Sequence, residues 1–236
     1  MTKIVISQPM FFPWGGLFEQ VRLADIFVHY DDVAIPQGRS FIRRVQIKTP
    51  DGIQWLTVPV LHGSKLIRDV QIDNAQDWRT KHLKTLQRVY AKAPHADAML
   101  SLVEQVYAQP ISLLSDLNRC SIEAASAYLG FTPQFVVSSD FGTETCSSQK
   151  LLDLMLLLGG DTYITGHGAR NYLDHAIFAE REIQVEYMDY RRQPYPQLYG
   201  PFDPHVTVLD LIANVGPRAA DYLCSGTLPW KEFVGV

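Results

Sequence analysis

The chain has 236 residues, and 21 lysines and arginines against 25 aspartates and glutamates give a formal net charge of −4. This length allows a sizeable hydrophobic core without disulfide support, and the charge balance excludes a protein that binds bulk nucleic acid through overall positive charge. The three cysteines lie far apart, and neither a signal peptide nor a bilayer-spanning apolar stretch is recognisable, so we expect a cytoplasmic protein without membrane insertion.

The chain opens with an expected strand, turn, helix and strand. A β-branched run at residues 4–6 ends in a turn rich in proline and glycine, and an amphipathic segment at residues 17–24 precedes an apolar run at residues 26–30. Ligands of open α/β sheets bind outside the carboxyl ends of strands, and a helix N-terminus can receive an anion. A hydrophobic turn that binds nothing is the alternative. We expect three substrate-binding residues in this turn: Gln8, Trp14 and Gly16.

Two acids and a basic segment follow. Adjacent residues of a strand point to opposite faces, so at most one of Asp31 and Asp32 faces a given cleft; Asp32 is a catalytic candidate. The next segment brings four cations into ten positions, and the planar arginine fork suits phosphate or carboxylate groups. A solvated strand is the alternative. The substrate-binding candidates here are Arg39, Arg43, Arg44 and Lys48.

Residues 48–60 are typical of a β-hairpin. The tripeptide Pro50-Asp51-Gly52 favours a tight turn, and the alternating residues after it favour a returning strand. We expect a further strand at residues 66–72.

A basic helix is expected over residues 77–92. Its cations recur at helical spacing and place Lys81 on a basic stripe, with His82 beside it. Histidine alone titrates near neutrality when unperturbed, so His82 is the candidate general base or acid, and Lys81 a candidate substrate-binding residue. The alternative is a solvated helix face with a surface histidine.

Later segments alternate between helices and strands. The periodicity predicts helices at residues 96–107, 112–129, 147–158, 174–181 and 207–215. Apolar runs predict strands at residues 131–139, just before Thr165, and at residues 183–190. The pattern predicts an α/β fold with a mostly parallel sheet that resembles a nucleotide-binding fold, a β-hairpin insertion and a helical portion at about residues 77–130. We expect residues 1–236 to form a single domain.

The segment Thr-Gly-His-Gly at residues 165–168 is the second focal stretch. Its glycines leave backbone N–H groups free to face an anion, although neither G-x-G-x-x-G nor a P-loop lysine is present. The seven histidines are scattered without the spacing of a zinc helix, so we expect no metal requirement. We expect substrate contacts from this segment and from the aromatic stretch near residue 197: Thr165, Gly166, Gly168, Tyr172 and Gln197.

Several of these motifs together resemble the WbqC-like family. They are Gln8-Pro9, Phe12-Pro13-Trp14, the run Trp-Leu-Thr-Val-Pro-Val at residues 55–60, Lys81-His82, Tyr195-Pro196-Gln197 and Leu209-Asp210-Leu211. The resemblance covers nearly the whole chain and implies a bacterial protein of surface polysaccharide, often O-antigen, biosynthesis. Members commonly have histidine where this chain has Ser7.

The resemblance implies an enzyme that transfers an acyl or aminoacyl group to an amino group of a nucleotide-linked sugar. The arginines and lysines would hold the diphosphate, Trp14 or Tyr172 would stack on a base or sugar, and His82 would take the proton of the attacking amine. The cofactor is unknown, with an acyl or aminoacyl donor or ATP as options. We expect a small-molecule partner and no nucleic acid, and we consider a homodimer.

Two other functions stay open. The opening unit is similar to the nucleotidylyltransferase-like fold of pantothenate synthetases, and residues 169–173 are similar to their second ATP loop, which favours an ATP-dependent activating enzyme. The turn lacks the paired histidines of those enzymes. The third option is a non-catalytic module that binds sugar nucleotides. We expect the opening turn, the basic helix and the glycine segment to surround one hollow.

Overall fold

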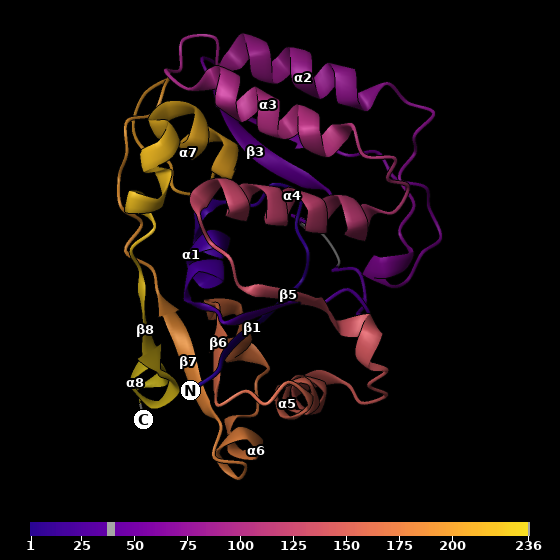
Figure 1. Cartoon of the computed structure of the whole chain (residues 1–236), viewed down its shortest axis with the longest axis vertical. Helices are drawn as coiled ribbons and strands as arrows, with labels where there is room; N and C mark the ends of the chain where they lie inside the picture. The colour runs from indigo at the N-terminus through magenta and orange to yellow at the C-terminus, as the bar shows by residue number, and fades with distance from the viewer. Residues whose placement is uncertain (37–40, 236) are drawn as a thin grey trace.

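The computed structural model describes residues 1–36 and 41–235, and a six-stranded sheet lies at its centre (Figure 1). Neighbouring strands are parallel except for the last pair, β7 and β8, which is antiparallel. This confirms the predicted mostly parallel α/β sheet. In the spatial order β5-β2-β1-β6-β7-β8, the strands are β5 (Gln134–Val137), β2 (Ile26–His29), β1 (Lys3–Ser7), β6 (Thr162–Thr165), β7 (Gln184–Asp189) and β8 (Gly226–Pro229).

The strand order contains a switch point between β1 and β6. Numbered along the chain, β1, β2, β5, β6 and β7 are the first to fifth parallel strands, and their spatial order is therefore 3-2-1-4-5. The chain builds outward from β1 on one side through β2 and β5, then returns to the other side of β1 for β6 and β7. Open sheets of this kind bind ligands at the carboxyl ends of the strands, where the direction of winding reverses.

Helices cover both faces of the sheet. Successive side chains of β1 point to opposite faces, and both faces are apolar. Val5 packs in one cluster with α1, α4 and α7, whereas Ile4 and Ile6 pack in another with α5 and α6. None of the helices described in residues 1–36 and 41–235 is long and apolar enough to cross a membrane. The eight helices of those residues are α1 (Gly15–Leu23), α2 (Trp78–Val89), α3 (Ala96–Tyr107), α4 (Leu114–Leu129), α5 (Ser147–Leu157), α6 (His175–Ala179), α7 (Val208–Val215) and α8 (Trp230–Val234).

The predicted hairpin is present as a separate two-stranded sheet. β3 (Arg44–Thr49) pairs antiparallel with β4 (Gly52–Thr57), and Gly52 in the turn has a φ of +109°, which favours glycine. Figure 1 shows α2, α3 and α4 gathered at one end of the molecule, with β3 beside them. The apolar side chains of the hairpin and these helices share one buried cluster, so the hairpin and the predicted helical portion pack as a unit.

Two segments differ from the prediction. The expected strand at residues 66–72 is wrong, because the chain forms the 3₁₀ turn η1 (Ile67–Asp69) there. Leu66, Gln71 and Ile72 each bridge a different segment, which leaves no continuous ladder. The sequence also did not predict β8 and α8; β8 is a four-residue edge strand that contains both glycine and proline, residues that are depleted in strands. The single domain over residues 1–236 stays a prediction.

Candidate functional site

A hollow of about 590 Å³ opens at the switch point of the sheet. Ser7 and Gln8 line it from the end of β1, Thr165 and Gly166 from the end of β6, and Tyr30 from the end of β2. We call it the switch-point hollow; its volume suits a small-molecule ligand. It brings together five residues predicted from the sequence: Gln8, Thr165, Gly166, Gly168 and Tyr172.

The lining of the switch-point hollow is polar and aromatic. Of the described residues that line it, none carries a formal charge. Burial raises the pKa of Tyr30 above its usual range, with the Asp32 carboxylate adding to the effect, and burial likewise raises the pKa of Tyr163. Both phenols therefore stay protonated at neutral pH and can donate hydrogen bonds to a ligand.

Two glutamines line the switch-point hollow, and they differ in whether the amide has a hydrogen-bond partner within the protein. The Nε2 of Gln20 donates to the Tyr190 hydroxyl at 2.9 Å, which fixes that amide. The half-buried amide of Gln8 has no hydrogen-bond partner within residues 1–36 and 41–235. An amide without an internal partner at the end of a central strand is available to a ligand.

Open space surrounds one of the two glycines after β6. A Cβ atom added to Gly168 would meet no heavy atom within 4 Å, so packing does not require glycine there. The absent side chain leaves the backbone of η3 (His167–Asn171) open to close approach. His167 itself turns away, because its Nε2 lies 2.6 Å from the Met188 carbonyl oxygen.

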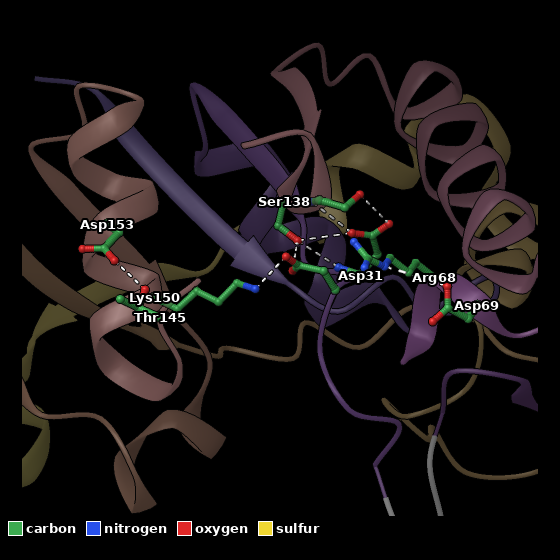
Figure 2. Close-up of polar contacts among 9 residues, drawn as sticks. Asp31, Arg68, Asp69, Ser138, Thr145, Lys150 and Asp153 are labelled. Carbon is green, nitrogen blue, oxygen red and sulfur yellow. Dashed lines mark hydrogen bonds and ion pairs between the residues drawn. The ribbon is translucent and has the colours of Figure 1, made fainter. Parts of the chain in front are cut away.

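Asp32 forms a buried ion pair beside the switch-point hollow. The Nζ of Lys150 lies 2.6 Å from Oδ2 of Asp32, and the two side chains are 7% and 8% exposed. The Ser138 hydroxyl donates to the other carboxylate oxygen at 2.6 Å. Figure 2 shows Lys150 extending from α5 toward Ser138 and Asp31. Because both oxygens of Asp32 have internal partners, the geometry favours a role in positioning rather than direct contact with a ligand.

Lys150 also connects this pair to the lining of the hollow. Its ammonium lies 5.7 Å from the ring centroid of Tyr30. Sequence reasoning did not identify Lys150 or Ser138. The available signal was a lysine placed directly before Leu151 and Leu152 in a leucine-rich helix, which indicates a buried charge in need of a partner.

Trp14 and Gly16 lie outside the switch-point hollow. The Trp14 ring covers Gly16 so closely that an added Cβ atom would come within 2.2 Å of it, and the ring also packs against Tyr190 and His205. The crevice beside them measures about 30 Å³, which suits water rather than a sugar. Packing at the start of α1 therefore accounts for both residues, and their predicted substrate contacts stay predictions.

Lys48 and Gln197 lie together, away from the switch-point hollow. The buried Lys48 ammonium donates to Gln197 Oε1 at 3.0 Å, to the Gly200 carbonyl at 3.2 Å and to the Pro201 carbonyl. These bonds hold the loop at residues 197–201 against β3.

A third predicted binding residue, Arg44, also lies away from the switch-point hollow. The Arg44 guanidinium lies 4.5 Å from the centroid of the Trp55 ring, on the hairpin. Arg39 falls outside the described residues, so its predicted role is untouched by the structure.

His82 is buried between α2, α3 and the hairpin. Its Nε2 donates to the Thr57 carbonyl at 3.2 Å, and its Nδ1 accepts from the Tyr107 hydroxyl at 2.9 Å, an arrangement that the neutral ring satisfies. Burial lowers the pKa of His82 to about 4, against a smaller opposing effect of the Thr57 bond. The geometry therefore favours a structural role for this ring.

The expectation of one shared hollow is wrong. Arg43, Lys81 and His82 line a second hollow of about 350 Å³, which shares no lining residue with the switch-point hollow. The reason is that α2 packs on α3 and the hairpin, not on the carboxyl edge of the large sheet.

Comparison with known proteins gives two matches. The model of the WbqC-like protein family matches residues 8–222. The chain is also 35% identical over 228 residues to the uncharacterized protein Rv1507c of Mycobacterium tuberculosis (strain ATCC 25618 / H37Rv), a match that covers 94% of this chain and 98% of the relative. No solved structure matches the chain.

Proposed function

Because the chain belongs to the WbqC-like protein family, we propose that its switch-point hollow is the substrate site of a cytoplasmic enzyme of bacterial surface polysaccharide (O-antigen) biosynthesis. The substrate is a nucleotide-linked amino sugar, and the reaction transfers an acyl or aminoacyl group to its amino group. One observation carries the proposal: a hollow of about 590 Å³ lies at the switch point of an open, mostly parallel sheet, the place where such sheets bind ligands.

The chemistry of the lining supports a sugar ligand. Hydroxyl-rich ligands need neutral donors and acceptors, which the Gln8 amide and the Tyr30 hydroxyl supply. Tyr172 is 58% exposed at the hollow, so one ring face is free to stack on a sugar or a base.

Backbone groups are suited to hold the diphosphate of such a ligand. Lysine and arginine are absent from the described lining, but the backbone around Gly168 is open, and Ser147 lines the hollow from the first position of α5. Free N–H groups at the start of an eleven-residue helix favour an anion. The proposed transfer step does not use His82, which borders the second hollow.

Removal of the Gln8 amide tests this assignment. In wild-type protein, a uridine diphosphate-linked amino sugar at 100 times its dissociation constant should raise the stability by about 2.7 kcal/mol in a thermal-shift experiment. Loss of one ligand hydrogen bond, worth roughly 1–1.5 kcal/mol, should weaken the affinity of Gln8→Ala by about tenfold. Gln54→Ala removes an exposed amide on the hairpin and should bind like wild type. Equal affinities of Gln8→Ala and Gln54→Ala would overturn the assignment.

A second candidate function, an ATP-dependent activating enzyme, is favoured by the strand order together with the position of η3. Arg170 and Asn171 end this turn directly after β6, next to the switch-point hollow. Such an enzyme would incorporate labelled pyrophosphate into ATP when supplied with the acid that it activates. A transferase that uses a preformed donor would show no exchange but would turn over that donor, and a non-catalytic module would show neither activity.

A further inference from the structure

The hollow beside α2 differs from the switch-point hollow in its charge. Arg43 and Lys81 line it, both exposed, and no acid is among its described lining residues. Neither cation has an acidic partner in the part of the chain that the structure describes. The Gln76 amide at the rim is already engaged, since it donates to Asp73 at 2.7 Å. We call this site the cationic hollow.

Helix α2 adds to the positive potential at the cationic hollow. Residues 78–92 contain five cations and no acid, although the whole chain has a net charge of −4. Lys81, Lys84 and Arg88 are exposed and follow one another at spacings of three and four residues, which places them on one side of the helix. Arg43 and Lys81 line the hollow, and the further cations along α2 add to the positive field that attracts an anion.

The remaining walls of the cationic hollow add no further charge. Pro59 and Trp78 contribute apolar surface, and the neutral His82 ring already uses both nitrogens internally. An anion that enters would meet the Arg43 guanidinium, from the residue just before β3, and the Lys81 ammonium from α2. A guanidinium and an ammonium that line the same hollow suit a phosphate group with two negative charges.

We propose that the cationic hollow binds a phosphate group of a second ligand, apart from the ligand of the switch-point hollow. The recognised chemistry is a phosphate monoester or diphosphate, held by Arg43 in bidentate fashion and by Lys81 as a point charge. This site goes beyond the proposed transfer reaction, because it shares no lining residue with the hollow assigned to that reaction.

Titration of the full chain with inorganic pyrophosphate tests the proposal. Calorimetry should show binding to wild type that weakens as the salt concentration rises. Arg43→Gln and Lys81→Gln should each weaken binding at least tenfold, whereas Lys65→Gln, an exposed lysine elsewhere, should not. Because both side chains are exposed, we expect the two substitutions to leave the stability unchanged. Unfolding curves that match wild type will show that the variants fold. Absence of binding at millimolar pyrophosphate, or equal binding by Arg43→Gln and Lys65→Gln, would overturn the site.

Further arms of the experiment identify the ligand and separate the two hollows. Succinate that competes as well as pyrophosphate would contradict recognition of phosphate. Phosphatidic acid carries a phosphate monoester, so co-sedimentation with vesicles that contain it, reversed by pyrophosphate, would assign the phosphate to a lipid headgroup. Pyrophosphate binding without co-sedimentation would assign it to a free phosphorylated molecule. Gln8→Ala should keep the pyrophosphate affinity of the cationic hollow while its sugar-nucleotide affinity falls about tenfold, so the assignments of the two hollows are tested separately.

Discussion

Replacement of Lys150 by methionine is expected to lower the free energy of unfolding by about 3–5 kcal/mol, the usual cost of breaking a buried ion pair. The Lys150 ammonium lies 2.6 Å from the Asp32 carboxylate, and both side chains are almost inaccessible to water. Methionine fills a similar volume without the charge, so the Asp32 carboxylate would be left buried and unpaired. Denaturation by urea at pH 7 measures the loss.

Two control variants distinguish loss of the pair from loss of a lysine. Lys65→Met removes an exposed lysine and should change the stability by no more than about 0.5 kcal/mol. The double variant Asp32→Asn/Lys150→Met removes both charges and keeps an acceptor for the Ser138 hydroxyl, so it should recover most of the loss. Equal stability of Lys150→Met and Lys65→Met would contradict a desolvated pair.

The ion pair between Lys150 and Asp32 also illustrates what could not be predicted from the sequence. The expected elements from residue 3 to residue 29, and the helix Ala96–Tyr107, followed from local periodicity and were confirmed. The contact between Lys150 and Asp32 spans 118 positions of the chain, and no local pattern encodes it. Only the placement of α5 over the end of β2 brings the two residues together.

Part of the candidate site was predictable because the carboxyl ends of parallel strands lie at the same edge of a sheet. Gln8 follows β1 and Thr165 ends β6, so a shared sheet edge could be expected, and both line the switch-point hollow. Residue type and local position, in a turn before a helix for Trp14 and beside a basic stripe for His82, do not reveal the packing around these two rings. Burial and packing decide what such side chains can do, and both depend on long-range contacts with Tyr190 and Tyr107.

Acid is expected to destabilise the fold through His82. Burial lowers the pKa of His82 from 6.5 to about 4. Between these values the unfolded chain binds more protons than the folded one, so the contribution is complete above pH 6.5 and is lost as the pH falls toward 4. The total loss is about 3 kcal/mol. Burial also lowers the pKa of His29, so the wild-type protein should lose still more stability over this range.

The variant His82→Gln isolates the contribution of this one ring. Glutamine does not titrate, so its stability between pH 7.5 and pH 4.5 should decline less steeply than that of wild type, even though the variant starts lower by about 1–3 kcal/mol through the loss of a buried hydrogen bond. His62→Gln, a change at an exposed histidine, should keep the wild-type slope. Parallel curves for wild type and His82→Gln would mean that the ring titrates like a solvated one, and a general base at the cationic hollow would then become the better assignment for His82.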